Sequence, residues 1–388
     1  MKKTKCLFPE GESTQGMVSV SQLQSFMSCP KKWSYGYIEN LTPRVEKTYL
    51  TVGKLCHKAM QVAMDAAWVD QRRGTPEDET DWHDWKNAGL SAMRIGWCEY
   101  MENTPMTPEE EQDMHEALHT AASVFTQAFE EFRPWRYEVL TVFDGKKEYP
   151  ALELHFLVPC AGSKGLHGFI DAILKDKETG LIWCTDYKFR KALSPDEDEE
   201  VNIQNTVYTH ACKKMGINIT GTMTWQHVNT AAADPAILKN GSVSRAKIKT
   251  TWDHYAAFVL DRGGDPATYE TEMKEKLADI EWFRVTHEFR NEETVKNMWN
   301  RIIVPAAYAV KSARTAASRG LDLKRQMYPW NCKMCQYRSL CQAELRNYDA
   351  DFLRETAFVE RSPRGNDIID TANTPVVQLN QKGGQHDE

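Results

Sequence analysis

The sequence contains no long apolar run, and no stretch approaches the roughly 20 residues that a membrane-spanning helix needs. Residues 1–16 carry lysines without the apolar stretch of a signal peptide. The chain also lacks a G-x-x-x-x-G-K-S/T phosphate-binding motif, any internal repeat and any excess of positive charge, since its formal net charge is −7. These absences argue against a membrane protein, a nucleotide-driven motor and a protein that coats nucleic acid non-specifically. We expect a cytoplasmic protein without a membrane partner.

The composition provides enough apolar residues for a large core. The 388 residues are 41% hydrophobic and 27% charged, which suits one large domain with insertions or two domains. Helical periodicity gives way to alternating apolar residues and then returns, which favours an α/β core with helical insertions. We divide the chain into a disordered N-terminus (1–18), N-terminal helices (19–70), a helical insertion (71–134), a strand-rich core (135–230), a helical region (231–328), a cysteine motif (329–350) and a largely disordered tail (351–388).

The local pattern predicts individual elements. Alternating apolar residues between turn residues indicate strands over 136–144, 151–159, 166–176, 181–189 and 221–229. Apolar residues at helical spacing predict helices over 51–70, 87–102, 107–132, 201–216, 265–283 and 293–320. "TPEEEQ" from Thr107 is typical of a helix N-terminus, with proline in the first turn and acids near the positive end of the dipole. Residues 71–86 are expected to form a polar loop.

Ten cysteines and one basic segment also need an explanation. Disulfides are not expected in a reducing compartment, so six scattered cysteines suit buried thiols. The other four are Cys29 and the C-x2-C-x5-C group Cys332, Cys335 and Cys341. From Arg301 to Arg338 the chain has eight Lys/Arg against one acid. This segment, with Arg314 and Arg319, is a candidate for phosphate contact, and a solvated helix face is the alternative.

Two apolar strands carry acidic residues at matching positions. The turn between segments 166–176 and 181–189 centres near Glu178, so folding the hairpin there brings Asp171 opposite Asp186 within a residue of register. Lys188 points to the same side as Asp186, because strand side chains alternate. Two facing carboxylates repel, and burial makes each charge more costly, so a divalent cation would compensate.

A third carboxylate lies on the neighbouring strand. Glu153 falls on the opposite face from Leu152, Leu154 and Phe156. Three carboxylates and a lysine suit Mg²⁺ or Mn²⁺, which can bind a phosphate oxygen and lower the pKa of a water. The lysine can orient that water or neutralise developing charge. The alternative interpretation is an ordinary hairpin with a surface Asp–Lys ion pair.

These residues resemble the PD-(D/E)XK nuclease superfamily, specifically its RecB-like exonuclease branch. The resemblance rests on Gly-x-x-Asp ending at Asp171, Asp-x-Lys from Asp186 to Lys188, Gln-x-x-x-Tyr from Gln204 to Tyr208, and Gly-x-x-x-His ending at His57. It implies a restriction-endonuclease-like core, a mixed central sheet flanked by helices. It also implies His57, Asp171 and Asp186 as Mg²⁺ or Mn²⁺ ligands, Lys188 and Glu153 as catalytic groups, and Gln204 and Tyr208 near the DNA backbone.

The four grouped cysteines fit the same resemblance. One N-terminal and three C-terminal cysteines resemble the iron–sulfur staple of AddB-type and CRISPR-adaptation nucleases. The resemblance implies a 4Fe–4S cluster on Cys29, Cys332, Cys335 and Cys341 that clips distant chain segments together across a long loop. Zinc is the main alternative, because four cysteines also suit it. Free thiols are a further alternative.

The sequence therefore predicts a metal-dependent DNA exonuclease that serves recombination or end processing. Its partners would be DNA and a single-strand annealing protein or helicase, and the length and C-terminal layout suit a phage-encoded protein in the host cytoplasm. Two alternatives stay open. One is an iron–sulfur protein that binds DNA without cutting it, and the other is an adaptation-type nuclease that acts with an integrase.

Overall fold

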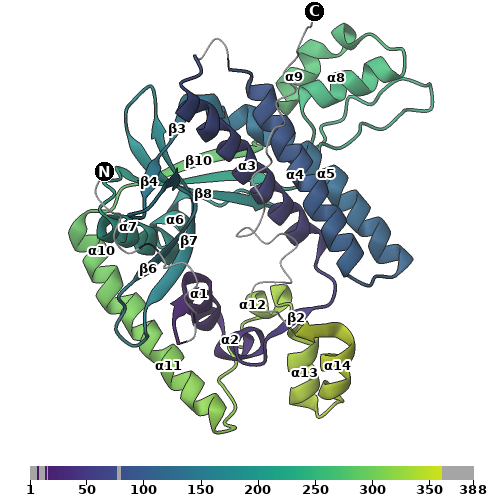
Figure 1. The fold of residues 1–388 in the computed structure, drawn as a ribbon. Coiled ribbons are helices and arrows are strands. Elements are labelled where there is room, and N and C mark those ends of the chain that lie inside the picture. Colours follow the sequence, from purple (N-terminus) through teal and green to yellow (C-terminus); the bar gives the residue numbers. More distant parts are fainter. Residues whose placement is uncertain (1–6, 8–13, 15, 77–79, 361–388) are drawn as a thin grey trace, which may run out of the picture.

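The computed structural model of the chain describes residues 7, 14, 16–76 and 80–360. Its centre is a sheet with seven strands among the described residues, and Figure 1 shows this sheet between two groups of helices. No helix within that part of the chain is long and apolar enough to cross a membrane. The predicted fold class, a mixed central sheet flanked by helices, is confirmed.

The sheet is built around one long strand, β7 (Leu166–Asp176). One edge of β7 pairs antiparallel with β6 (Leu152–Val158) and then with β3 (Tyr137–Val139). The other edge pairs parallel with β1 (Val18–Ser19) and then antiparallel with β8 (Ile182–Arg190). Beyond β8 follow β9 (Gly221–Val228), which is parallel to β8, and β10 (Phe283–Glu288), which is antiparallel to β9.

One face of the sheet is covered by three long helices, α3 (Thr48–Arg73), α4 (Trp82–Asn103) and α5 (Pro108–Phe132). Thr107 and Glu110 form a capping box at the start of α5, where the sequence predicts a helix N-terminus. At Gly89 of α4 an added Cβ would lie 2.6 Å from the Ala59 carbonyl oxygen of α3, so only glycine allows these two helices to approach so closely. The buried stripe of α3, which includes Leu55 and Ala59, thus faces both the sheet and α4.

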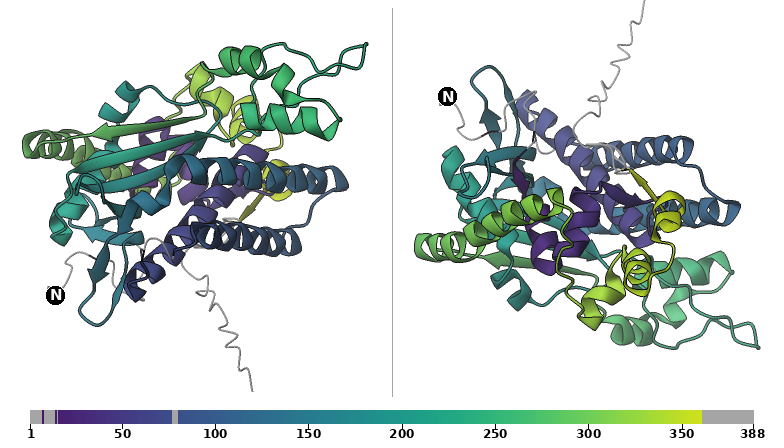
Figure 2. Two further views of the ribbon diagram at one scale, coloured as in Figure 1. Left: turned by 90° about the horizontal axis from the view of Figure 1, so that it is seen from above. Right: turned by 90° about the horizontal axis from the view of Figure 1, so that it is seen from below.

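The opposite face is covered by α1 (Val20–Ser28), α7 (Ile203–Met215) and α11 (Val304–Ser318). Short α6 (Asp196–Glu200) precedes α7, and α10 (Glu292–Met298) precedes α11 through a π-helical turn over Trp299–Ile303. Between β9 and β10 the chain forms a small lobe with α8 (Trp252–Asp261) and α9 (Glu270–Leu277) around its own apolar cluster. Figure 2 shows this lobe projecting from the rest of the protein.

The C-terminal module comprises α12 (Pro329–Met334), α13 (Arg338–Arg346), α14 (Ala350–Ala357) and β11 (Phe358–Glu360). It rests on α2 (Pro30–Tyr37), and β11 pairs with β2 (Leu41–Pro43). The prediction of a disordered tail from residue 351 is wrong for residues 351–360, because Phe358 is buried in this module. The rest of the tail lies outside the described residues.

Most predicted elements are present, although several differ in extent or type. The strand predicted over 136–144 is two short strands, β3 and β4 (Thr141–Phe143), and β4 pairs with β5 (Glu148–Pro150) in a separate hairpin. The helical region 231–328 contains β10, and Val18, placed in a disordered N-terminus, begins β1. In the loop predicted over 71–86, α3 runs on to Arg73 and α4 starts at Trp82.

Candidate active site

The site lies where β7 and β8 part. The last pair of their ladder is Ala172 with Thr185, so the register places Asp171 opposite Asp186, as the turn predicts. Further along, the same edge of β7 pairs with β1 instead. At the fork, Asp171 Oδ2 accepts a hydrogen bond from Tyr187 N at 2.8 Å. The carboxylate of Asp171 is thereby fixed at the open end of the hairpin.

Glu153 reaches the same point from β6. This strand pairs Leu152 with Ala172 and Leu154 with Ile170, so Glu153 lies across from Asp171. The backbone of Glu153 has φ +44°, in the left-handed region, which costs a non-glycine residue about 1–2 kcal/mol. Such conformations persist where the surroundings hold a residue in a particular position. In this backbone conformation, one carboxylate oxygen of Glu153 lies close to the carboxylate of Asp171.

His57 completes a group of three potential metal ligands. It comes from α3, and its Nδ1 lies 3.6 Å from Asp171 Oδ2. One ligand atom each from His57, Glu153 and Asp171 all lie within 4.8 Å of one another. Two carboxylates and an imidazole suit Mg²⁺ or Mn²⁺. The sequence predicts Asp186 as the third ligand beside His57 and Asp171, whereas the structure brings Glu153 into this group.

Asp186 belongs to a hydrogen-bonded network beside these ligands. It is only 2% exposed, and Lys188 Nζ lies 2.9 Å from its Oδ1 and 2.7 Å from its Oδ2. Gln204 Nε2 also lies 2.9 Å from Asp186 Oδ1 and 2.7 Å from Tyr208 Oη. Tyr208 Oη in turn donates to the Phe169 carbonyl oxygen at 2.5 Å. Because Gln204 and Tyr208 are one helical turn apart on α7, one helix face fixes the orientation of Asp186 and Lys188.

Burial raises the pKa of two enclosed carboxyl groups, Glu153 and Asp186. The pKa of Glu153 is raised well above its ordinary value, first by burial and then by the negative charge of Asp171. The pKa of Asp186 is also raised by burial, although the Lys188 ammonium acts against this shift. Both carboxyls therefore take up a proton more readily than free carboxyls when no divalent ion is bound, and a bound divalent ion would favour the charged forms.

Glu153→Gln is expected to change the response of the protein to metal. A raised folded-state pKa stabilises the fold at low pH, and this stability is lost as pH rises through the folded value. At neutral pH the metal-free variant should therefore melt at a higher temperature than the wild type, while its stabilisation by Mn²⁺ should shrink. For the wild type, Mn²⁺ at a hundred times Kd would contribute about 2.7 kcal/mol. Thermal unfolding with and without Mn²⁺, from acid to neutral pH, measures both effects.

A matched control is Glu138→Gln, which removes an exposed glutamate of β3 that pairs with Lys175. This variant should retain the full metal-induced shift. An unchanged shift in Glu153→Gln would mean that Glu153 is not a ligand.

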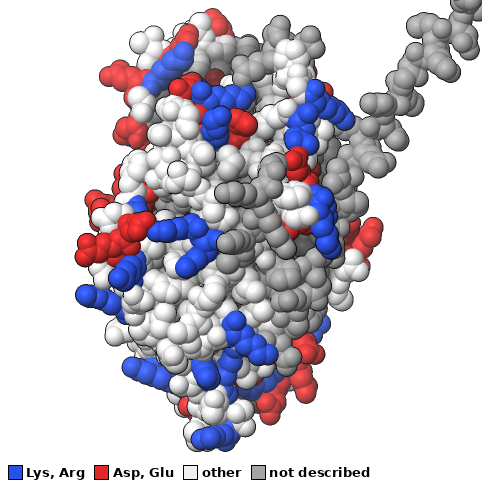
Figure 3. Space-filling model, turned by 60° about the vertical axis from the view of Figure 1, so that its left-hand side comes forward, with Lys and Arg blue, Asp and Glu red and all other residues white. Residues whose placement is uncertain are grey.

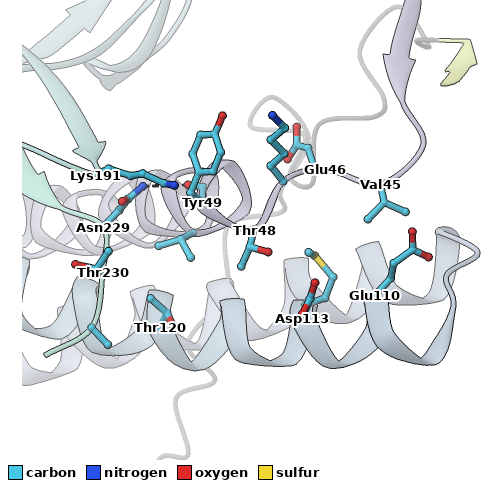
Figure 4. A pocket seen from close by; sticks show the side chains of 14 residues that line it. Val45, Glu46, Thr48, Tyr49, Glu110, Asp113, Thr120, Lys191, Asn229 and Thr230 are labelled. Atoms are coloured by element: carbon cyan, nitrogen blue, oxygen red, sulfur yellow. Dashed lines mark hydrogen bonds between the residues drawn. The ribbon is translucent and has the colours of Figure 1, made fainter. Parts of the chain in front are cut away.

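One hollow adjoins the network, and a second lies near the end of β8. A hollow of about 430 Å³ is lined by Lys188, Arg190 and Gln204 together with Gln24 of α1. A second hollow of about 590 Å³ lies between the start of α3, α5 and the chain after β9. Figure 4 shows Lys191 and Tyr49 on the wall of this second hollow. Consecutive basic residues at the end of β8 thus line two neighbouring spaces in which a substrate strand could lie.

Comparison with known proteins agrees with this geometry. The family model described as PD-(D/E)XK nuclease superfamily matches residues 17–342, well over half of the chain. The chain belongs to the PD-(D/E)XK nuclease superfamily. None of the curated proteins matches it. Membership of this superfamily implies a nuclease that acts on DNA with divalent metal ions. The three grouped ligands could bind such an ion.

The four predicted cluster cysteines of this nuclease converge where the C-terminal module meets the start of α2. Cys29, Cys332, Cys335 and Cys341 all line one cavity of about 70 Å³. The backbone N–H of Gln326 donates to Cys29 Sγ at 3.4 Å, and Lys31, Lys32, Arg325 and Arg338 also line the cavity. The donors and cations would stabilise thiolate charge, so the residues present fit a metal-containing group.

The two predicted basic contacts of the nuclease differ in environment. The Arg314 guanidinium is partly buried and donates to Met17 O and Gln22 Oε1, both at 2.9 Å, so it holds α11 against the N-terminal segment. Arg319 is exposed at the end of α11. On the face seen in Figure 3, Lys and Arg lie among acidic and uncharged residues without forming a continuous basic stripe.

Sequence reasoning missed Lys58, the residue after His57. It is only 3% exposed, and its positive charge opposes the rise in the pKa of Glu153. The available signal was a lysine within the buried stripe of α3. Gln24 and Arg190 were also missed, and nothing in their local sequence sets them apart.

Proposed function

We propose that this nuclease is a Mg²⁺- or Mn²⁺-dependent DNA exonuclease that serves recombination or end processing. The observation that carries the proposal is the placement of the ligand group His57, Glu153 and Asp171 beside the Asp186–Lys188–Gln204 network. Exonuclease activity and a recombination role rest on the resemblance to the RecB-like branch, whose motif positions are all filled. A single-strand annealing protein or a helicase would be the partner.

The residues divide the chemistry between them. His57, Glu153 and Asp171 would hold the divalent ion, which when bound supplies a Lewis acid for a phosphate oxygen. Asp186 holds Lys188 in place from the same strand, β8, and Gln204 fixes Asp186 from α7. Lys188 would orient the attacking water and stabilise negative charge as the water oxygen bonds to phosphorus and the ester oxygen leaves. Tyr208 acts by positioning Gln204.

We further propose that the four cysteines hold a 4Fe–4S cluster. Their common cavity supports this assignment. A tetrahedral zinc site with Zn–S bonds of about 2.3 Å brings its sulfurs to roughly 3.8 Å from one another. Within the described part of the chain, the cysteines do not form a group with ligand atoms inside 4.8 Å, whereas His57, Glu153 and Asp171 do. This wider spacing favours a larger group over a single zinc ion.

The test is digestion of end-labelled linear duplex, linear single strand and closed circular duplex. Anaerobically purified protein would be used with Mg²⁺ or Mn²⁺, beside the Asp186→Asn variant. We expect the protein to digest linear DNA and to leave closed circles intact, and we expect the Asp186→Asn variant to be inactive. The end labels report the polarity of digestion. Cleavage of circles would make the protein an endonuclease. Binding without any cleavage would favour a non-catalytic DNA-binding protein.

A further inference from the structure

The segment that leads into α12 exposes large apolar side chains to solvent. Trp330 is 76% exposed, Tyr328 is 64% exposed and Met327 is 62% exposed. Aromatic residues of this size normally bury most of their surface. Within the described residues, the side chains of Tyr328 and Trp330 make no ring contact or hydrogen bond. We call Met327, Tyr328 and Trp330 the aromatic ledge.

The same module shows how its other aromatic residues are used. Tyr337 stacks on Phe358 with ring centroids 5.6 Å apart and contacts Tyr35 at 5.3 Å. All three are buried in the small core of the module. The module therefore completes its core without the aromatic ledge, which leaves Tyr328 and Trp330 available for a ligand.

Charge around the aromatic ledge indicates which ligand it suits. Between Arg319 and Arg338 the chain carries five Lys/Arg and a single acid, Asp322. Asp322 is already paired with Lys31 and Arg325, while Lys324, Lys333 and Arg338 are exposed. Exposed aromatic rings among cations are the features by which proteins bind single-stranded nucleic acid, since bases stack on the rings and phosphates meet the cations. Protein–protein interfaces also use Tyr, Trp and Met, but they are depleted of lysine, so the exposed Lys324 and Lys333 favour nucleic acid.

The aromatic ledge is connected to the active site through α1. Met327 lines the four-cysteine cavity together with Cys29, the residue at the end of α1. Gln24, five residues earlier on the same helix, lines the hollow beside Lys188. Five residues of α-helix span about 7.5 Å. A DNA strand that leaves this hollow along α1 would therefore reach the aromatic ledge within a few nucleotides.

We propose that Tyr328 and Trp330 form a stacking platform for bases of a single DNA strand that runs between the C-terminal module and the active site. Every base has a face that can stack, so the platform binds without regard to sequence. Duplex DNA keeps its bases stacked internally and gains nothing from it. The proposal rests on the proposed function, because it assigns the platform to the DNA of that site.

The experiment measures binding separately from cleavage. In an Asp186→Asn background without divalent metal, fluorescence anisotropy gives Kd for a labelled single-stranded oligonucleotide and for a blunt duplex at several salt concentrations. Trp330→Ala should weaken single-strand binding by roughly 10-fold and leave the salt dependence unchanged, since a stacked base releases no counterion. Lys333→Ala should instead reduce the salt slope. Duplex affinity should stay within twofold in Trp330→Ala.

Two controls keep the result interpretable. Trp330→Phe preserves a ring and should recover most of the affinity, whereas loss of affinity through damage to the nearby cysteines would not be recovered. Leu260→Ala removes a side chain that is 62% exposed on α8 in the projecting lobe, and it should have no effect.

An unchanged single-strand Kd in Trp330→Ala would overturn the platform, and so would an equal loss for single strand and duplex. An effect that occurs only with an added partner protein would also overturn it and make the ledge a protein interface. If native protein cuts DNA while Trp330→Ala binds normally, only the platform is wrong. If native protein never cuts while Trp330→Ala loses single-strand affinity, only the proposed nuclease function is wrong.

Discussion

Asp186→Asn is expected to lower the cleavage rate by about 10³-fold or more while the protein stays folded. The amide cannot neutralise Lys188, whose Nζ lies 2.7 Å from Asp186 Oδ2. It also removes the anionic acceptor of Gln204. The lysine would then lose the orientation it needs to stabilise charge on the phosphate. Single-turnover digestion of end-labelled DNA at saturating Mn²⁺ measures the rate.

A matched control lies at the other end of the same hairpin. Asp176 is also an aspartate that is only 4% exposed, but it pairs with Arg136, whose hydrogen bonds lower the pKa of Asp176 to about 2. Asp176→Asn should lower the melting temperature at neutral pH and leave the cleavage rate within a factor of about two. The stability that this pair supplies is present at neutral pH and is lost as pH falls below about 4.

The Asp186→Asn variant should therefore lose activity without losing stability, and the Asp176→Asn variant should lose stability without losing activity. Asp186→Asn should keep or raise the melting temperature of the metal-free protein, because it removes a buried carboxyl whose pKa is raised. An active Asp186→Asn protein, or an Asp176→Asn protein that is folded and inactive, would contradict the assignment of the site.

Cys332→Ser is expected to abolish iron binding and to destabilise the C-terminal module. The buried apolar core of the module consists of only four side chains, Tyr35, Tyr337, Leu340 and Phe358, which is too small to hold it firmly. A cross-link between Cys29 and Cys332 closes a loop of about 300 residues, and the chain-entropy relation for cross-links gives on the order of 6 kcal/mol. Visible absorbance, iron and sulfide content and limited proteolysis should all report the loss.

Cys98→Ser is the control, because Cys98 is exposed on α4 and far from the other four in the chain. This variant should keep its colour and its resistance to protease. A colourless wild type that carries one zinc per chain would show that the four cysteines hold zinc. A protease-resistant Cys332→Ser protein would show that ion pairs such as Lys31–Glu344 and Arg325–Glu344 suffice to hold the module.

The site residues could be predicted where short-range rules apply. The turn residues fix the register of the hairpin, and this brings Asp171 across from Asp186. The alternation of a strand puts Lys188 beside Asp186, and a spacing of four puts Gln204 beside Tyr208 on one helix face. Each of these relations depends on neighbours within one element or one hairpin.

The amino-acid sequence by itself thus determined the hairpin, the order of elements, the start of α5 and the superfamily motifs. The tertiary structure decided which potential metal ligands lie together, because the docking of α3 and the left-handed backbone of Glu153 bring His57, Glu153 and Asp171 within reach of one ion. It also decided that Gln204 binds Asp186, and that Arg314 binds the N-terminal segment. These contacts join residues on separate elements, up to 297 positions apart for Arg314 and Met17. Their geometry depends on how helices pack on the sheet, which no local pattern of residues encodes.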